Sequence, residues 1–487
     1  MKLLKDILYK VTVNAVYGDT NKKVSRVVFD SREVTKGILF VAQRGVNADG
    51  HAYIHKAIEL GATSVVCENI PEEKVKEVTY VEVENSSSAL AIIAANFYGN
   101  PSSKLALVGV TGTNGKTTIA SLLYELFRKA GYKAGLLSTV KVMVNLTEQI
   151  ATHTTPDSVA INKYLSQMVD ADVEFCFMEV SSHGIHQKRT EGLEFAGGIF
   201  SNLSHDHLDY HKTFSEYRDV KKSFFDSLPK SSFALTNLDD KNGQLMLQNT
   251  KAKKRTYALK TLADYKAKII EKRLSGTMIS FDGTEVWTKL IGTFNIYNLL
   301  AIIGTAYELG LDKFQVLTIV SELESVSGRF QYVISDKGVT AIVDYAHTPD
   351  ALKNVLETIN DIRTGNEKLI TVVGCGGDRD KSKRPKMAHI ASQLSNQSIF
   401  TSDNPRTEDP EVILEEMEAG VAPENFKKTL TISDRRQAIK TACKFSQSGD
   451  ILLIAGKGHE TYQEINGERF HFDDLEEVTK CFNLLKK

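Results

Sequence analysis

The chain has 487 residues, with 60 lysines and arginines against 61 aspartates and glutamates. That length suits about three domains, and a net charge of −1 gives no electrostatic reason to expect a nucleic-acid or acidic-membrane partner. The hydrophobic share of 42% is ordinary for a globular protein, so we expect a small-molecule ligand.

The N-terminal stretch MKLLKDILYK is interrupted by Lys5 and Asp6 and lacks the pattern of a secretory signal. No apolar run approaches the roughly 18 residues of a membrane-spanning helix. The 5 cysteines are scattered and form no recognisable motif. These features predict a cytoplasmic protein in a reducing compartment, without a membrane span. We expect a monomer.

Three blocks follow one another along the chain. Residues 1–102 mix short strand-like and helix-like segments, which predicts a small N-terminal α/β domain. Residues 103–331 alternate apolar runs with helical periods, as is typical of a parallel sheet. Residues 332–487 repeat this alternation in TAIVDY, KLITVVGCGG, QSIFTSD and DILLIAG. We therefore predict an α/β fold of three domains, the central one P-loop ATPase-like and the C-terminal one Rossmann-like.

The strongest chemical signal is GVTGTNGKTT, residues 109–118, between a strand-like run and a helix expected to begin near Lys116. Backbone amides of such a loop turn toward phosphate oxygens, the lysine reaches the β- and γ-phosphates, and Thr117 can bind Mg²⁺. Val110 stands where the strict pattern has its first glycine, so a plain glycine-rich turn is the alternative. The residues predicted to hold ATP here are Gly112, Thr113, Asn114, Gly115, Lys116, Thr117 and Thr118.

Side chains suited to a divalent cation follow the next two strand-like runs. FCFMEV ends in Glu179, and GGIFSNLS is followed by HDHLDYH, which contains His207. A carboxylate and an imidazole beside a P-loop can bind a metal ion near the γ-phosphate. Zinc bound by His205, His207 and His211 is the alternative, but no cysteine accompanies them.

A series of motifs along the chain resembles those of the Mur ligases of peptidoglycan synthesis. They are GTNGKTT, HTTPD, MEVSSHG, NLSHDHLDYH, FNIYN, SGRF, DYAHTPDAL, GCGGDRDKSKRP, DNPRTEDP and AGKGHE. The earlier stretch from FDSREVTKG to KAIELGA is similar to the nucleotide-sugar domain of that family. The similarity spans nearly the whole chain. Within the family, the motifs resemble most those of the members that add the third residue of the stem peptide.

The resemblance implies an ATP-dependent amide ligase that adds meso-diaminopimelate to UDP-N-acetylmuramoyl-L-alanyl-D-glutamate. A substrate carboxylate would attack the γ-phosphate to form an acyl phosphate, the incoming amine would attack the acyl carbon, and ADP and phosphate would leave. Lys116 would neutralise charge on the transferred phosphoryl group. Asn295, Arg329 and Asp344 match family positions around the adenine, phosphate and ribose of ATP.

Lys221, in EYRDVKKSFF, matches the lysine that the family carries as a carbamate, and Lys222 is the neighbouring candidate. Taken alone, these residues would predict an exposed helix lysine. The carbamate would bind Mg²⁺ as a carboxylate does. The resemblance thus implies a metal site formed by Thr117, Glu179, His207 and carbamylated Lys221, and catalytic roles for Lys116, Lys221, Glu179 and His207.

The resemblance also implies a site for the nucleotide-sugar dipeptide, whose polar groups suit hydroxyl, amide and guanidinium partners. The matching positions are Ser31, Thr154, Thr155, Ser181, Gln187 and Arg189. His153 departs from the family pattern, so it is not among these positions.

The loop DNPRTEDP would bind the incoming amino acid. One arginine can clamp the α-carboxylate, and a second suits an amino acid with a distal carboxylate, as in meso-diaminopimelate, whereas Arg406 would repel the ammonium of lysine. Glu460 would receive the distal amine. An exposed arginine in a helix-capping turn is the alternative. The matching positions are Arg379, Asp403, Asn404, Pro405, Arg406, Gly456 and Glu460.

Other functions share parts of this pattern. A ligase that adds L-lysine or another diamino acid would use the same core, and so would a folylpolyglutamate synthetase-like ligase. The N-terminal DSR segment and DNPR argue against the latter. A nucleotide-gated binding protein could use the P-loop without turnover, and amine-dependent phosphate release would exclude it.

Overall fold

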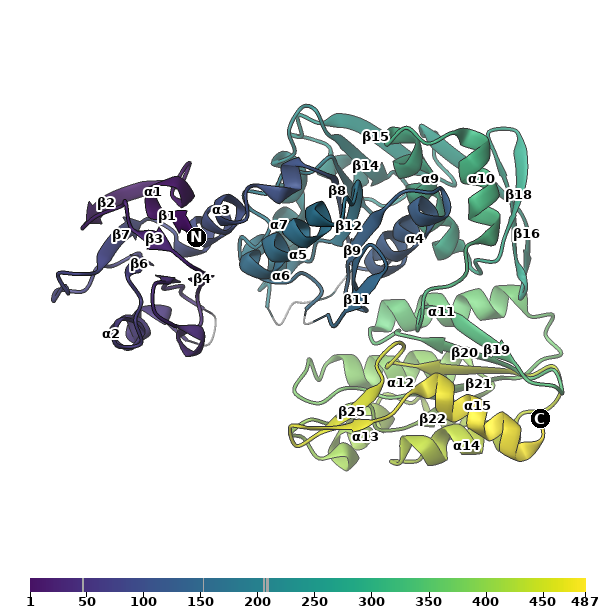
Figure 1. Ribbon diagram of the computed structural model, residues 1–487. Coiled ribbons are helices and arrows are strands. Elements are labelled where there is room, and N and C mark those ends of the chain that lie inside the picture. Colours follow the sequence, from purple (N-terminus) through teal and green to yellow (C-terminus); the bar gives the residue numbers. More distant parts are fainter. Residues whose placement is uncertain (46–47, 152, 205, 207–209) are drawn as a thin grey trace.

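A computed structural model describes residues 1–45, 48–151, 153–204, 206 and 210–487 (Figure 1). Three large sheets, each with its own helices, follow one another along the chain, beside two small two-stranded sheets, β1-β3 and β25-β26. The predicted α/β fold with three domains is therefore confirmed. The N-terminal region, purple in Figure 1, lies to one side of the central sheet, and the C-terminal region lies below it. The boundaries placed after residues 102 and 331 stay predictions.

The N-terminal region is built on a five-stranded sheet of order β2-β7-β6-β5-β4. Its inner strands are buried on both faces, as their Val-rich sequences predict. Helix α3 packs against α5 of the central region and so joins the two regions. The elements are β1 (Lys2–Leu3), α1 (Leu4–Ile7), β2 (Val13–Tyr17), β3 (Lys23–Val24), β4 (Val27–Val28), η1 (Ser31–Glu33), β5 (Leu39–Val41), η2 (Gly50–Tyr53), α2 (Ile54–Glu59), β6 (Ser64–Cys67), β7 (Thr79–Val83) and α3 (Ser86–Phe97).

The central region contains an 11-stranded sheet of order β11-β10-β9-β12-β8-β13-β14-β15-β16-β17-β18. The strands from β9 to β16 in this order are parallel, and antiparallel strands extend both edges. Parallel strands place their carboxyl ends along one edge, where loops can bind ligands. The strands are β8 (Ala106–Thr111), β9 (Ala134–Leu137), β10 (Val142–Val144), β11 (Thr147–Gln149), β12 (Phe175–Glu179), β13 (Gly197–Phe200), β14 (Phe233–Asn237), β15 (Lys253–Ala258), β16 (Tyr265–Arg273), β17 (Gly276–Phe281) and β18 (Thr284–Thr288).

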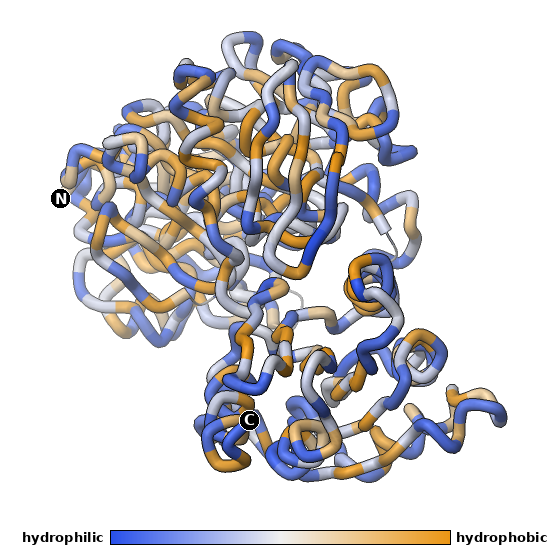
Figure 2. Tube along the Cα trace, turned by 90° about the vertical axis from the view of Figure 1, so that its right-hand side faces the viewer, coloured by the Kyte–Doolittle hydropathy of each residue, from blue (hydrophilic) through white to orange (hydrophobic). Residues whose placement is uncertain are grey.

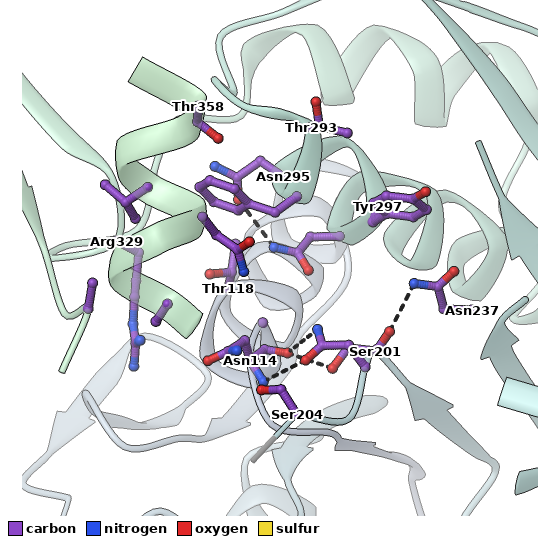
Figure 3. A pocket seen from close by; sticks show the side chains of 18 of the residues that line it. Asn114, Thr118, Ser201, Ser204, Asn237, Thr293, Asn295, Tyr297, Arg329 and Thr358 are labelled. Atoms are coloured by element: carbon purple, nitrogen blue, oxygen red, sulfur yellow. Dashed lines mark hydrogen bonds between the residues drawn. The ribbon is translucent and has the colours of Figure 1, made fainter. Parts of the chain in front are cut away.

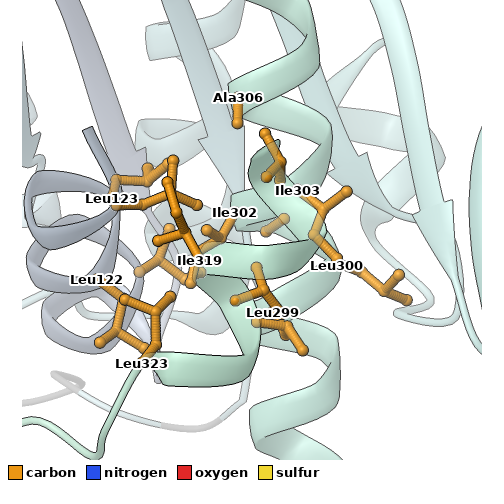
Figure 4. Packing of buried hydrophobic residues seen from close by; sticks show 14 of the residues in the cluster. Leu122, Leu123, Leu299, Leu300, Ile302, Ile303, Ala306, Ile319 and Leu323 are labelled. Carbon is orange, nitrogen blue, oxygen red and sulfur yellow. The ribbon is translucent and has the colours of Figure 1, made fainter. Parts of the chain in front are cut away.

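Three helices form a packed layer that includes α4, the helix at the end of the phosphate loop. Apolar residues of α4, α9 and α10, among them Leu122, Leu299 and Ile319, interdigitate in one buried cluster (Figure 4). Burying such side chains stabilises the fold by about 2 kcal/mol each. The helices of this region are η3 (Pro101–Ser103), α4 (Lys116–Lys129), α5 (Ser158–Asp170), α6 (Ser182–His186), α7 (Phe214–Asp226), α8 (Gly243–Met246), α9 (Thr293–Glu308) and α10 (Lys313–Glu322).

The C-terminal region has a six-stranded sheet of order β19-β20-β24-β21-β22-β23, in which β19 is the antiparallel edge strand. A separate hairpin, β25–β26, follows β24. The elements are β19 (Gln331–Ile334), β20 (Thr340–Asp344), α11 (Pro349–Ile362), β21 (Leu369–Val373), α12 (Lys383–Leu394), β22 (Gln397–Phe400), α13 (Pro410–Glu418), η4 (Pro423–Lys428), β23 (Thr429–Thr431), α14 (Arg435–Phe445), β24 (Ile451–Ala455), β25 (Tyr462–Ile465), β26 (Glu468–His471) and α15 (Asp474–Leu485).

Hydrophobic segments run through the interior of the sheets, while hydrophilic segments mark many of the connecting loops (Figure 2). In the part of the chain that the structure describes, no helix combines the length and apolar character needed to cross a membrane.

Candidate active site between the central and C-terminal sheets

Two adjoining cavities lie between the central and C-terminal regions, with volumes of about 450 Å³ and about 350 Å³. Five residues line both, so the cavities form one continuous cleft. They are Asn114, Gly115, Arg329, Tyr345 and His347. We call the larger cavity the nucleotide cavity and the smaller one the transfer cavity.

The phosphate loop follows β8 and ends where α4 begins at Lys116, as the sequence predicts. Gly112 and Gly115 have φ angles of 146° and 89°, which favour glycine. A Cβ on Gly112 would lie 2.0 Å from Ser201 Oγ, and one on Gly115 would lie 2.5 Å from Asn298 Oδ1. The loop therefore packs so closely on its neighbours that only glycine fits at both positions.

Lys116 curls over this loop. Its Nζ donates to the carbonyl oxygens of Gly112 at 3.0 Å and of Thr113 at 2.8 Å. Burial in the cleft lowers the pKa of Lys116, while Glu179 and Asp206 oppose that effect. The ammonium thus lies where it can turn from the carbonyl oxygens toward an incoming phosphate.

Thr117 and Glu179 form the oxygen-rich part of the cleft. Thr117 Oγ1 donates to Glu179 Oε2 at 3.0 Å, and the other carboxylate oxygen accepts from the backbone of Thr139 at 2.7 Å. A hydroxyl and a carboxylate are the donors that Mg²⁺ prefers. The described part of the chain contains no cluster of three or more His, Cys, Asp or Glu side chains suited to a metal ion. His205 and His207 lie outside the described residues.

Lys221 is buried, with 1% of its surface exposed, so it is not an exposed helix lysine. Its Nζ donates to the Gly112 carbonyl oxygen at 2.9 Å and lies 4.7 Å from the centre of the Tyr217 ring. Burial, assisted by the charge of Lys116, holds the pKa of Lys221 well below its ordinary value. Lys222 instead forms an ion pair with Asp226 at 2.7 Å. Lys221 is the better candidate for chemistry that needs a neutral amine.

The nucleotide cavity is bounded by α9 on the central side and by α11 on the C-terminal side. Figure 3 shows Asn295 between Arg329 and Thr358 on one side and Tyr297 on the other. Asn295 Nδ2 donates to the Ile291 carbonyl oxygen at 2.8 Å, so its side chain is fixed. All three residues predicted for this part of the ATP site, Asn295, Arg329 and Asp344, line the cavity.

Asp344 ends β20 and is buried. One of its carboxylate oxygens accepts from the Phe330 amide at 2.6 Å. Burial raises the pKa of Asp344 to about 6, although Arg329 and the backbone donors partly oppose the shift. Phe330 has a φ of 51°, which is unusual for a non-glycine residue, and this bond holds it in place.

Of the residues predicted for the nucleotide-sugar dipeptide, four form a connected group beside the cleft. Thr155 accepts from the Ser181 amide at 2.9 Å, and Arg189 donates to the Thr155 carbonyl oxygen at 2.6 Å and to Gln187 Oε1 at 2.6 Å. Thr154 lines the transfer cavity. Ser31 lies apart, in η1 of the N-terminal region, where it is buried.

Most of the residues predicted to bind the incoming amino acid lie together at one end of the transfer cavity. Its lining includes Arg379, Asp403, Asn404, Arg406, Gly456 and Glu460. Pro405 packs against Gly377, in the loop that follows β21, because a Cβ on Gly377 would lie 1.9 Å from the Pro405 carbonyl oxygen. Asn404 Nδ2 donates to Glu460 Oε2 at 2.7 Å. The loop is thus closely packed rather than an open turn, and the cap of α13 is Asp409.

Arg406 is held in a left-handed backbone conformation, with a φ of 52°. Its amide donates to the Glu464 carbonyl oxygen at 3.0 Å, and its own carbonyl oxygen accepts from the Asn466 amide at 2.7 Å. Its guanidinium donates to the Gly377 carbonyl oxygen at 2.7 Å. Backbone strain of this kind persists where the surrounding structure enforces it, here through hairpin β25–β26.

The sequence reasoning missed several residues of the cleft. Lys383 pairs with Asp206 at 2.9 Å, which joins the C-terminal region to the central one. Arg384 is buried and binds Glu408 at 2.8 Å and Glu416 at 2.6 Å. Lys383 and Arg384 belong to the motif GCGGDRDKSKRP, in which only Arg379 was given a role. Two adjacent basic residues in that motif were the sequence feature that could have indicated them.

Three family models match the chain. They are described as "Mur ligase family, catalytic domain" over residues 23–98, "Mur ligase middle domain" over 110–306 and "Mur ligase, glutamate ligase domain" over 328–458. The chain belongs to the Mur ligase family. It is an ATP-dependent ligase by this membership, and the cleft that we describe lies between the segments matched by the middle and glutamate ligase domains.

Individual Mur ligases match the chain along its whole length. A protein of Cytophaga hutchinsonii is 56% identical, with 99% of this chain and 100% of the relative covered. One of Bacteroides thetaiotaomicron is 53% identical, again with 99% and 100% covered. Both are named UDP-N-acetylmuramoyl-L-alanyl-D-glutamate--2,6-diaminopimelate ligase. A solved structure of a ligase of that name is 33% identical, with a TM-score of 0.70 over 100% of this chain and 99% of that one.

Proposed function

We propose that this Mur ligase joins meso-diaminopimelate to UDP-N-acetylmuramoyl-L-alanyl-D-glutamate at the expense of ATP, in the cytoplasmic synthesis of peptidoglycan precursors. Its relatives carry the name of that activity over the full length of the chain. The observation that carries the proposal is the continuous cleft, in which the phosphate loop and the Arg406 loop line the same transfer cavity.

The arrangement suits an acyl-phosphate route. The substrate carboxylate attacks the γ-phosphorus and the bond to ADP breaks. The amine of the amino acid then forms a bond to the acyl carbon, phosphate leaves, and the amine gives up a proton. Lys116 is placed to stabilise the charge of the transferred phosphoryl group. Arg329, which donates to Thr117 Oγ1 at 3.1 Å, places a second cation beside the loop.

Thr117 and Glu179 would hold Mg²⁺, with His207 as a further predicted ligand outside the described residues. When bound, Mg²⁺ would offset negative charge on the phosphates. Lys221 is proposed to react with carbon dioxide, because its depressed pKa favours the neutral amine. The amine nitrogen would bond to the carbon of CO₂ and lose a proton, which leaves a carbamate near the Gly112 carbonyl oxygen of the phosphate loop.

The Arg406 loop is proposed to select the amino acid. Arg379 and Arg406 both line the transfer cavity, and two guanidinium groups suit an amino acid with two carboxylates. Glu460 lines the same end and would accept from an ammonium group. Lysine has one carboxylate, so it would leave one arginine without an anionic partner.

The test is an assay of phosphate release and of ligated product. Purified protein is incubated with ATP, Mg²⁺ and UDP-N-acetylmuramoyl-L-alanyl-D-glutamate, and then with meso-diaminopimelate, L-lysine or ornithine. We expect release only when both co-substrates are present, with meso-diaminopimelate preferred. Phosphate release at the same rate with and without an amino acid would contradict the ligase assignment. A preference for lysine would contradict the assignment of meso-diaminopimelate as substrate.

A further inference from the structure

Lys457 is a buried lysine that the reaction described above does not use. It follows β24, and none of its side-chain surface is exposed. It does not occur among the described residues that line the transfer cavity, so it lies behind the wall formed by Gly456 and Glu460. Burying an ammonium is costly unless oxygen atoms surround it, and their positions therefore matter.

Three side-chain oxygens surround the Lys457 ammonium. Its Nζ donates to Asn404 Oδ1 at 3.0 Å and to Glu460 Oε2 at 3.3 Å, and it lies 3.5 Å from Asp403 Oδ1. All three partner residues line the amino-acid end of the transfer cavity. One buried cation thus contacts, from outside the cavity, the side chains of three residues that line it.

Lys457 also fixes which way Asn404 points. An ammonium can only donate, so it holds the amide oxygen of Asn404 toward itself, and the Glu464 amide donates to the same oxygen at 3.0 Å. The NH₂ group of Asn404 must then face the other way, where it donates to Glu460 Oε2 at 2.7 Å. Tyr345 donates to the second oxygen of Glu460 at 3.3 Å. Together these bonds hold the Glu460 carboxylate in one orientation.

The positive charge of Lys457 offsets part of the negative charge of the Asp403 and Glu460 carboxylates. Arg379 and Arg406 line the open side of the cavity, where they can meet substrate carboxylates. Arg435, which also lies near Asp403 and Glu460, is engaged in a buried ion pair with Asp474 at 2.7 Å. Without Lys457, the amino-acid end would therefore carry one more unit of negative charge.

We propose that Lys457 is a positioning and selectivity residue, which orients Glu460 through Asn404 and restrains the negative charge of the pocket so that an amino acid without net charge is preferred to a cationic one. This inference rests on the proposed function. Meso-diaminopimelate has no net charge as a zwitterion, whereas lysine carries one positive charge. Removal of the buried cation favours lysine relative to meso-diaminopimelate, because an additional negative charge attracts the more positive substrate.

The experiment compares kcat/KM for meso-diaminopimelate and for L-lysine in wild type and Lys457→Met. We expect kcat/KM for meso-diaminopimelate to fall by about a hundredfold and the preference over lysine to fall by about tenfold. Lys457→Arg keeps the charge and should keep the preference within about twofold of wild type. Lys480→Met, which removes an exposed lysine from α15 of the same region, should leave both values unchanged.

Asp403→Asn keeps the buried lysine and tests the same balance in the opposite direction. With one carboxylate removed, the preference for meso-diaminopimelate over lysine should rise, even if both rates fall. This variant decides the matter if Lys457→Met does not fold. Affinity for a non-hydrolysable ATP analogue should stay within about twofold of wild type in every variant, because the nucleotide cavity lies at the other end of the cleft.

The outcomes separate the two proposals. If the wild type ligates neither amino acid, the proposed function is wrong. If the wild type prefers meso-diaminopimelate and the preference stays fixed in Lys457→Met and Asp403→Asn, the ligase proposal stands and the role of Lys457 is overturned. An equal fall for both amino acids in Lys457→Met, or a fall in preference in Asp403→Asn, would likewise overturn it.

Discussion

The guanidinium of Arg329 donates to Thr117 Oγ1 at 3.1 Å and lies 4.6 Å from the centre of the Tyr345 ring. Arg329 belongs to the segment that runs between the central and C-terminal sheets, and Thr117 is the second residue of α4, the helix that follows the phosphate loop. Tyr345 in turn reaches Glu460 at the amino-acid end. These contacts thus connect the phosphate site of the central region to the amino-acid end of the cleft in the C-terminal region.

Gly328 should be intolerant of a side chain. A Cβ there would lie 2.0 Å from the His459 amide nitrogen, and its φ is 67°. We expect Gly328→Ala to lower the free energy of unfolding by about 2–4 kcal/mol, because it adds a backbone clash to an unfavourable conformation. Urea denaturation measures this loss.

Gly310→Ala is the matched control, because Gly310 has a φ of 90° and a Cβ there would have no neighbour within 4 Å. It should lose only about 1–2 kcal/mol, the cost of the left-handed conformation. Equal losses in the two variants would show that the approach of Gly328 to His459 does not constrain the fold.

Lys221→Ala tests the proposed carbamate. Loss of the buried amine removes both the bond to Gly112 and the group proposed to react with carbon dioxide, so ligation should fall by about a thousandfold or more. Small carboxylates such as formate or acetate should restore part of the rate, because they can supply the missing anion. Lys222→Ala, beside it on α7, should retain most activity. Activity in Lys221→Ala that is near normal without added carboxylate would remove the proposed role.

Asp344 should make stability depend on pH. Its pKa is raised to about 6 in the folded protein, whereas an unfolded aspartate has a pKa of about 3.9. The folded state therefore binds more protons between these values, and its stability falls as pH rises from about 4 to about 7, by about 2–3 kcal/mol. Asp344→Asn should lack this component of the pH dependence. If the unfolding free energies of wild type and Asp344→Asn change with pH by the same amount between about pH 4 and about pH 7, Asp344 is not the source of the pH dependence.

Arg406→Ala should change selectivity more than general activity. If Arg406 pairs with the distal carboxylate, its removal costs about 2–5 kcal/mol, or a loss of about thirtyfold to several thousandfold in kcat/KM for meso-diaminopimelate. The preference over lysine should narrow, since repulsion of the lysine ammonium is relieved. Arg469→Ala, an exposed arginine on β26, serves as control. If the ratio of kcat/KM for meso-diaminopimelate to kcat/KM for lysine is the same in Arg406→Ala as in wild type, Arg406 does not select the amino acid.

The phosphate loop could be predicted from sequence because its determinants are local. A strand, glycines and a Lys-Thr pair follow one another within a few residues, and α4 begins at Lys116 as expected. The metal-binding role of Glu179 stays a prediction, but its place at the end of β12, beside Thr117, follows from the order of parallel strands.

The rest depends on contacts between distant segments. The Lys383–Asp206 pair joins residues 177 positions apart, and no local pattern indicates it. The left-handed conformation of Arg406 is enforced by hairpin β25–β26, which the sequence reasoning did not identify. The burial of Lys221 could not be read from its helix, because it depends on how α7 packs beneath the phosphate loop.

The central claim is that the chain forms an acyl phosphate and passes it to meso-diaminopimelate. The most direct measurement uses UDP-N-acetylmuramoyl-L-alanyl-D-glutamate with ¹⁸O in the accepting carboxylate, ATP, and equal concentrations of meso-diaminopimelate and L-lysine. The account predicts one ¹⁸O in each phosphate released and a product that carries meso-diaminopimelate almost exclusively. Unlabelled phosphate would contradict the acyl-phosphate route, and a product that carries lysine would contradict the assigned substrate.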